Sequence, residues 1–169
     1  KMLTKCVNII EGAKVILHKV VNPENFGVAQ VKDKKIVKIK EKPKKFFSDL
    51  AITGLYFFDN KVTEYARKLK PSKRNELEII DLLNQYRIKN RLSAELIGRG
   101  GAWLDTGSIE DFYKTSNFVS AIENQQGFKI ACLEEISLSN GWIKRSDIKK
   151  SIEFYGNCNY SKYLKKIIS

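Results

Sequence analysis

The sequence contains few of the side chains that most often carry redox, metal and nucleophilic chemistry. Of its 169 residues only three are cysteines, and Cys6, Cys132 and Cys158 are too widely spaced for a CxxC metal or redox pair. Buried or free thiols in a reducing compartment are the simpler interpretation, so we expect a cytoplasmic location. The only histidine, His18, falls in a segment typical of a β-strand, which disfavours a Ser-His-Asp triad.

Long apolar runs are also lacking. The most apolar stretch, VILHKVV, is interrupted by His18 and Lys19 and is far shorter than the roughly 20 residues of a membrane helix. The basic start is not followed by an apolar stretch and a cleavage site, and no internal repeat is visible. We therefore expect neither a signal peptide nor a membrane partner.

Positive charge is present in excess. The 31 lysines and arginines exceed the 19 acids and give a net charge of +12, which attracts nucleic acid, acidic membranes or phosphorylated small molecules. The lysines are spread along the chain and do not alternate with aromatic residues as on a base-stacking platform, so we expect no nucleic-acid partner. A hydrophobic content of 43% predicts a folded chain, and its length suits a single globular unit.

Hydrophobic periodicity predicts strands that alternate with helices, which indicates an α/β layered fold. The predicted strands cover residues 13–21, 28–43 (a hairpin with a polar turn at Asp33 and Lys34), 51–59 and 92–98. The predicted helices cover residues 2–10, 60–69, 76–88 and 108–126. A short strand followed by several small helices is expected over residues 128–169.

Local signals make this outline more specific. Gly54 interrupts a strand and predicts a bulge or the close approach of a ligand. Asp59 or the residue after it is placed to cap the next helix. Ser108 with Asp111 resembles a capping box, although Glu or Gln is usual at the second position, and Gly127 is placed to end that helix.

The stretch RGGAWLDTG, residues 99–107, combines two adjacent glycines, a tryptophan and a single acid in one short loop. Glycine-rich turns bring backbone close to another group, and a carboxylate among apolar residues either binds a partner or costs stability. The loop is therefore a candidate binding segment, with Trp103 as a core or wall residue.

Three motifs, taken together and in order, carry a resemblance to a known family. They are NPENFGVAQV with KIKEKP, AITGLYFFDN with LKPSKRNELEIIDL, and GRGGAWLDTGS, followed by ENQQGFKIACLEEIS. They resemble the sugar-nucleotide pyrophosphorylases, most closely the glucose-1-phosphate thymidylyltransferase branch. The resemblance runs from about Ala13 to the C-terminus, but it covers only the later part of the family's chain.

The resemblance implies a fold and an activity. Residues 1–127 would form the mixed-sheet sugar-phosphate half of a Rossmann-like nucleotide-diphospho-sugar transferase fold, and residues 128–169 a small helical region. The implied reaction converts dTTP and glucose 1-phosphate to dTDP-glucose and pyrophosphate, in deoxysugar (dTDP-rhamnose type) and polysaccharide biosynthesis. Magnesium is the implied cofactor, and a homo-oligomer, a tetramer in the family, the implied assembly.

The family's Gly-rich nucleotide signature and its first metal-binding carboxylate lie upstream of anything in this sequence. We therefore expect a fragment that is the C-terminal part of such an enzyme, lacks its nucleotide-binding half and is inactive alone. The alternative is a non-catalytic module that binds a sugar phosphate, regulates or oligomerises.

The resemblance also assigns catalytic residues. Asp105 matches the family's second metal-binding carboxylate, and its alternative role is to cap the turn before Ser108. Lys42 matches the lysine that contacts the sugar phosphate, and Glu41 the acid that hydrogen-bonds sugar hydroxyls; alternatively both belong to a solvated charge run. Neighbours on a strand face opposite sides, so both reach one ligand only if Pro43 ends the strand and twists the chain.

Four further residues match substrate-binding positions. Gly27 matches the glycine whose backbone approaches the sugar, and Thr53 with Gly54 the wall of the sugar pocket. Arg74 matches an arginine near the phosphate and is the third expected catalytic residue. The alternative for Gly27 is a turn glycine, and that for Thr53 with Gly54 is a bulge. The alternative for Arg74 is a helix cap at the surface. Asn75 replaces the family's glycine after this arginine, and asparagine tolerates the left-handed backbone that a turn there needs.

Other departures concern which sugar is bound and how the protein is regulated. Lys40 replaces the usual acid of the family before Glu41, and Gly101 replaces an aromatic residue in the loop before Trp103. Arg99, Glu135 and Ile136 lie where the family's regulatory nucleotide-sugar site would fall.

Overall fold

The computed structural model describes residues 2–7, 11–72 and 75–169. Contacts within the chain divide it into two compact units, Lys1–Trp103 and Leu104–Ser169. This division lies upstream of residue 127, where the sequence analysis placed the boundary between the functional regions. That boundary stays a prediction.

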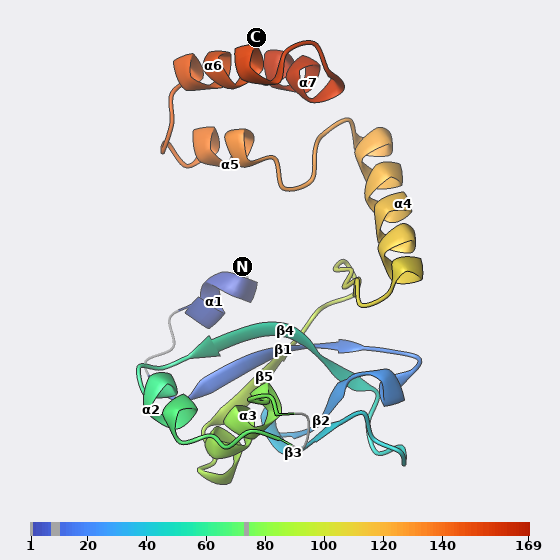
Figure 1. The fold of residues 1–169 in the computed structure, drawn as a ribbon, viewed down its shortest axis with the longest axis vertical. Coiled ribbons are helices and arrows are strands. Elements are labelled where there is room, and N and C mark those ends of the chain that lie inside the picture. Colours follow the sequence, from blue (N-terminus) through green and yellow to red (C-terminus); the bar gives the residue numbers. More distant parts are fainter. Residues whose placement is uncertain (1, 8–10, 73–74) are drawn as a thin grey trace. The chain divides into compact units, whose positions relative to one another are not determined.

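A five-stranded sheet forms the first unit (Figure 1). Its strands are β1 (Ala13–Lys19), β2 (Gly27–Lys32), β3 (Lys35–Glu41), β4 (Leu50–Phe58) and β5 (Leu92–Leu96). They close into a barrel in the order β1-β4-β2-β3-β5, in which β1 and β5 are parallel and the other pairs antiparallel. The mixed sheet implied by the family resemblance is confirmed. The helical elements of the first unit are α1 (Met2–Val7), a short 3-10 turn at Pro23–Asn25, α2 (Val62–Arg67) and α3 (Ile79–Ile88).

The core of this unit lies between the sheet and helices α2 and α3. Val15 and Leu17 on β1 are fully buried, as are Leu83 and Tyr86 on α3. Fully burying one such side chain contributes roughly 1.5–3 kcal/mol, so the apolar face of α3 fixes this helix on the sheet. The helix predicted over residues 2–10 is α1, and residues 8–10 lie outside the described part.

Two backbone features confirm predictions from the sequence. Asp33 and Lys34 have φ of 48° and 61°, as a two-residue hairpin turn between β2 and β3 requires. Gly54 has φ of 82° and lies where three residues of β4 stand opposite the single residue Ile16 of β1, so it forms the predicted bulge.

Asp59 has a different role from the predicted helix cap. The N-cap of α2 is Lys61, whose side chain makes no capping bond. The buried Asp59 carboxylate instead accepts hydrogen bonds from the Gly12 amide (2.7 Å), the Lys61 amide (3.0 Å) and the Tyr86 hydroxyl (2.8 Å). This correction follows from tertiary packing, because two of the three donors are more than 25 positions away in the chain.

Helices form the second unit: α4 (Ile109–Gln126), α5 (Leu133–Ser139), α6 (Arg145–Tyr155) and α7 (Asn159–Ile168). The Ser108 hydroxyl caps α4 by accepting the Asp111 amide at 3.0 Å, and Gly127 ends this helix with φ of 72°, as predicted. A small hydrophobic core of this unit contains Cys132, directly before α5, together with Ile148 on α6 and Leu164 on α7.

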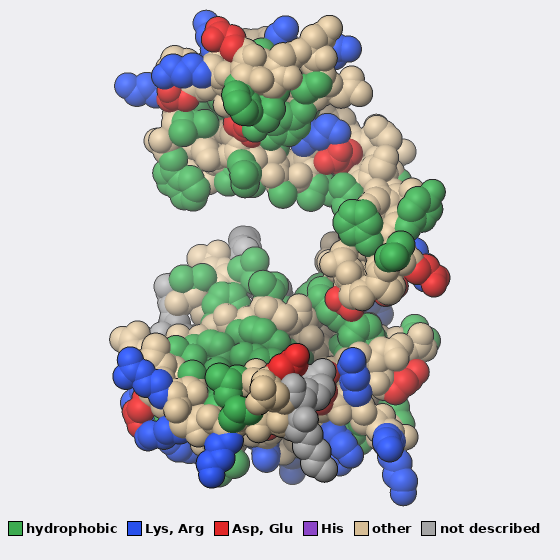
Figure 2. Space-filling model, viewed as in Figure 1, with side chains coloured by type: hydrophobic (Ala, Val, Ile, Leu, Met, Phe, Trp, Pro, Cys, Tyr) green, Lys and Arg blue, Asp and Glu red, His purple; other side chains and the backbone are tan. Residues whose placement is uncertain are grey.

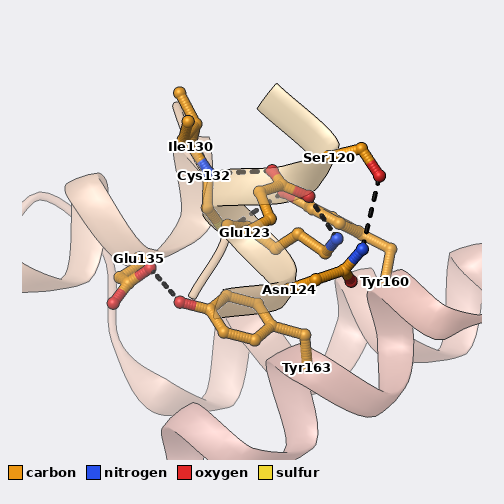
Figure 3. A network of polar contacts seen from close by, with 9 residues as sticks. Ser120, Glu123, Asn124, Ile130, Cys132, Glu135, Tyr160 and Tyr163 are labelled. Atoms are coloured by element: carbon orange, nitrogen blue, oxygen red, sulfur yellow. Dashed lines mark hydrogen bonds and ion pairs between the residues drawn. The ribbon is translucent and has the colours of Figure 1, made fainter. Parts of the chain in front are cut away.

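The predicted short strand after residue 127 is wrong. Residues 128–132 form a loop, in which Ala131 has φ of 55°. The Glu123 carboxylate of α4 accepts the Ile130 amide at 2.9 Å and pairs with Lys129 (Figure 3). The Glu123 side chain thus holds residues 129 and 130 against α4, and this segment does not pair with a strand. None of the helices in the described parts of the chain combines the length and apolarity needed to cross a bilayer.

Candidate functional site

A hollow of about 340 Å³ lies in the first unit between the end of β3 and the start of α3. It is lined by Glu41, Lys42, Glu78, Ile80 and Asp81. Glu41 and Lys42, which the sequence analysis assigned to one ligand, therefore line the same hollow.

Lys42 owes its position to an unusual backbone conformation. β3 ends at Glu41, Lys42 has φ of 40°, and the buried Pro43 follows. The Lys42 amide donates to the Phe26 carbonyl at 3.0 Å, which holds the turn against the start of β2. A left-handed lysine is uncommon and occurs where surrounding structure imposes it. This turn removes the strand alternation that would otherwise place Lys42 and Glu41 on opposite faces.

Gly27 makes room for the Glu41 side chain. The two residues are partners in the β2–β3 ladder. A Cβ added at Gly27 would lie 2.8 Å from Glu41 Oε2 and 3.2 Å from Ile80 Cδ1. Because Gly27 does not have a positive φ, space rather than backbone conformation requires glycine here. The Glu41 carboxylate thus lies across the bare strand, beside the hollow.

The charge of this hollow favours a polyhydroxylated ligand over a bare anion. Three carboxylates and one ammonium line it. Carboxylates accept hydrogen bonds from hydroxyls, and a lysine ammonium donates to a phosphate. Burial and the charge of the nearby Glu41 raise the pKa of Tyr56 on β4, although Tyr56 does not itself line the hollow. A sugar with one phosphate matches these groups.

Thr53 and Gly54 are not among the residues that line the hollow. The Thr53 hydroxyl donates to the Ile16 carbonyl at 3.0 Å, and its carbonyl accepts the Trp103 indole N–H at 3.1 Å. Trp103 is half-buried and packs edge-on against Phe26, with ring centroids 5.2 Å apart. Trp103 is therefore a packing residue of the first unit, which agrees with the core or wall position expected for it.

Asp105 belongs to the second unit and is exposed. It takes no part in the cap of α4, which Ser108 provides, so the alternative role in capping is not supported. Among the residues that the structure describes, Asp105 has no hydrogen-bond or ion-pair partner, and its Oδ2 folds over Gly107. The carboxylate is thus available to a ligand.

A magnesium ion needs few protein ligands. It is usually held by one or two carboxylates together with substrate phosphates. Asp105 fits that pattern as a single ligand. Within the described ranges, no three His, Cys, Asp or Glu side chains gather as a complete metal site.

The three residues matched to a regulatory site are not brought together within one unit. Arg99 is exposed in the first unit. Glu135 on α5 accepts the Tyr163 hydroxyl of α7 at 2.5 Å (Figure 3), and burial together with this bond raises the pKa of Tyr163. Ile136 is exposed. Glu135 therefore has a structural role in joining α5 to α7.

Arg74 lies outside the described residues, which end at Ser72 before it and resume at Asn75 after it. Asn75 has φ of 60°, and its amide donates to the Ser72 carbonyl at 2.9 Å. The Ser72 amide donates to the Glu76 carbonyl at 2.8 Å. Asparagine therefore adopts the left-handed conformation in place of the glycine, as expected.

Sequence reasoning missed Glu78, Ile80 and Asp81, which line the hollow from the N-terminus of α3. They lie in the motif that was matched, but only Arg74 was selected from it. The available signal was two acids at a helix start, where the helix dipole favours negative charge.

Comparison with known proteins gives close relatives. The sequence profile of the nucleotidyl transferase family matches residues 1–122. The glucose-1-phosphate thymidylyltransferase of Neisseria meningitidis is 43% identical over 158 residues, which cover 93% of this chain and 55% of the relative. That of Xanthomonas campestris pv. campestris is 42% identical over 155 residues, 91% and 52% of the two chains. The chain thus spans about half the length of the curated relatives it matches.

Solved structures agree. A Bacillus anthracis protein assigned as a glucose-1-phosphate thymidylyltransferase, in complex with a sucrose, has a TM-score of 0.61 and 40% identity, over 69% of this chain and 47% of that one. A UDP-glucose pyrophosphorylase complexed with UDP-glucose has a TM-score of 0.55 and 28% identity, over 63% and 43% of the two chains. With a profile match over most of its length and the α/β fold of these structures, this chain belongs to the nucleotidyl transferase family.

Proposed function

We propose that the chain is the sugar-phosphate-binding, C-terminal part of a glucose-1-phosphate thymidylyltransferase, which forms dTDP-glucose and pyrophosphate from dTTP and glucose 1-phosphate for deoxysugar biosynthesis. The observation that carries the proposal is the hollow that Glu41 and Lys42 share across the bare Gly27. The names of relatives at 42–43% identity support it.

The reaction is an in-line displacement at the α-phosphorus. A phosphate oxygen of the sugar phosphate bonds to that phosphorus as the bond to pyrophosphate breaks. Little covalent chemistry falls to the protein, so positioning and charge neutralisation dominate. Lys42 donates to the sugar phosphate, and Glu41 accepts hydrogen bonds from sugar hydroxyls. Gly27 leaves space for the Glu41 carboxylate. Arg74 would neutralise phosphate charge.

Asp105 would hold magnesium, which neutralises phosphate oxygens when bound. Nucleotide recognition would fall to a Gly-rich segment of the GGxGTRL type, which this sequence does not contain. We therefore expect no magnesium-dependent pyrophosphate release from this chain alone. Such release from a contaminant-free preparation would contradict this part of the proposal.

Calorimetric titration with glucose 1-phosphate tests the binding function directly. A hydrogen bond to a charged group is worth roughly 1.5–3 kcal/mol, so Lys42→Ala should weaken binding about tenfold to hundredfold. Lys44→Ala is the matched control, because Lys44 is exposed, close in sequence and outside the hollow. Equal losses in both variants, or no binding by the unmodified chain, would reject the proposal.

A further inference from the structure

A second hollow, of about 460 Å³, lies at the other end of α3 and β3. The candidate sugar-phosphate hollow is lined by Glu41 at the end of β3 and Ile80 at the start of α3. The second hollow is lined by Lys35 at the start of β3 and Arg87 at the end of α3. The ten residues of α3 span roughly 15 Å, so the two hollows are separate.

The second hollow is basic. Lys32 and Lys35 stand directly opposite each other in the β2–β3 ladder, and both line it together with Arg87. Of the described residues in its lining, the one acid is Asp33. Like charges directly opposite on neighbouring strands destabilise a sheet. An anion between these side chains would remove that repulsion.

Arg87 is held in place for such a contact. Its Nε donates to the Asn84 side-chain oxygen at 2.7 Å, and its Nη1 donates to the Val37 carbonyl at 3.3 Å. Two of the five N–H donors of the guanidinium are thus used, and the others remain for a ligand. A guanidinium that is already oriented loses little freedom on binding. The buried side chains of Ile36 and Leu92 add apolar lining.

We propose that this basic hollow binds a small anion with two or more negative charges, of the phosphate or phosphate-ester class, independently of the candidate sugar-phosphate hollow. Asp33 and the partial negative charge at the C-terminus of α3 oppose the anion. Binding is therefore weaker than three cations alone would provide, and it falls as ionic strength rises.

Titration of the ¹⁵N-labelled chain with inorganic pyrophosphate, followed by NMR, locates the site. Saturable shifts are expected for amides of the β2–β3 turn and the end of α3, including Lys35 and Asn90. Shifts confined to Gly27 and Lys42 would place the anion in the other hollow and overturn the proposal, as would the absence of saturable shifts. Inorganic phosphate in a parallel titration should bind at the same amides, but more weakly.

Three variants test the role of charge. Each exposed ion pair is worth up to about 1 kcal/mol, so Lys35→Gln should weaken pyrophosphate binding about twofold to fivefold. Asp33→Asn should tighten it by a similar factor, and asparagine suits the φ of 48° there. Lys34→Asn is the control, because Lys34 is in the same turn with φ of 61° but does not line the hollow.

The outcomes separate a built site from general attraction to a basic chain. An effect of Lys34→Asn as large as that of Lys35→Gln, or unchanged affinity in Asp33→Asn, would overturn the proposal. Folding of each variant is checked by its amide spectrum. Lys35 is exposed and its replacement relieves like-charge repulsion, so a folded variant is expected.

Discussion

At the scale of single residues, Gly27 and Asp59 show two ways in which one side chain determines local structure. Gly27 acts through the absence of a Cβ, which lets the Glu41 carboxylate lie across the strand. Asp59 acts through three hydrogen bonds that join the residue before β1, the start of α2 and the side of α3. The first affects the candidate site and the second the stability of the fold.

Gly27→Ala should therefore reduce glucose 1-phosphate binding. The added methyl group would meet Glu41 Oε2 at 2.8 Å, closer than real Cβ contacts, and the carboxylate must move. If Glu41 accepts two sugar hydroxyls at a typical 0.5–1.5 kcal/mol each, affinity should fall about fivefold to a hundredfold. Gly98→Ala is the control, because a Cβ there meets nothing within 4 Å. Unchanged binding by calorimetry in Gly27→Ala would remove Glu41 from the proposed site.

Asp59→Asn should lower the free energy of unfolding by about 1–3 kcal/mol, since an amide replaces an acceptor that faces three donors. Urea unfolding at neutral pH measures this loss. Asp49→Asn is a suitable control: it removes only the exposed ion pair with Lys19, worth less than about 1 kcal/mol. Similar losses in both variants would show that the buried network contributes little.

The same carboxylate predicts a pH dependence. Burial raises the pKa of Asp59, but the hydrogen bonds from Gly12, Tyr86 and Lys61 outweigh it, and the pKa lies below its ordinary value of 3.8. The stabilisation is thus fully present above that value and is lost as the pH falls through the lowered pKa. Between about pH 5 and pH 2, the unmodified chain should lose more stability than Asp59→Asn. Parallel losses would contradict this assignment.

At the scale of elements, α4 depends on its caps more than on its packing. None of its 18 residues is buried, while Ser108 satisfies the Asp111 amide and Gly127 ends the helix. A helix with little packing takes its stability from local interactions. The two ends of α4 were therefore readable from the sequence.

Ser108→Ala should destabilise the first turn of α4 by about 0.5–2 kcal/mol. Amide hydrogen exchange detects this as faster exchange at Asp111, whose amide loses its acceptor. Ser120→Ala is the matched control within the helix. Because alanine is the better helix former, protection there should stay the same or rise. Equal acceleration in both variants would show that the cap is not the cause.

At the scale of the whole molecule, exposed apolar side chains and net charge act in opposite directions. In the second unit Trp142 is 72% and Phe154 84% exposed, and Figure 2 shows hydrophobic side chains on the surface of this unit. Exposed apolar side chains favour association, whereas a net charge of +12 opposes it. This balance bears on the homo-oligomer that the family resemblance implies.

Self-association should therefore increase when ionic strength rises from about 0.05 M to about 0.5 M, because salt screens the repulsion. Sedimentation velocity measures the change. Phe154→Ser and Phe46→Ser should each reduce association, because each removes an exposed aromatic side chain, 84% exposed at Phe154 and 75% at Phe46. A chain that stays monomeric at every salt concentration would contradict the proposed self-association.

Much of the fold was predictable where the relevant groups are close in sequence. The residues themselves predict the hairpin turn at Asp33 and Lys34, the bulge at Gly54 and both ends of α4, and the family resemblance adds the left-handed Asn75. Each depends on the backbone conformation of one residue or on a hydrogen bond within a few positions. Such preferences act before any tertiary contact forms.

The sequence by itself determined the alternation of strands and helices, the hairpin turn and both ends of α4, and its resemblance to the sugar-nucleotide pyrophosphorylases pointed to Glu41 and Lys42. Only the tertiary structure decided that Glu78, Ile80 and Asp81 complete their hollow, and that Asp59 bonds Gly12 and Tyr86 rather than capping α2. The physical reason is distance along the chain. A hollow or a buried carboxylate depends on which remote groups packing brings within a few ångströms, and no local preference records that arrangement.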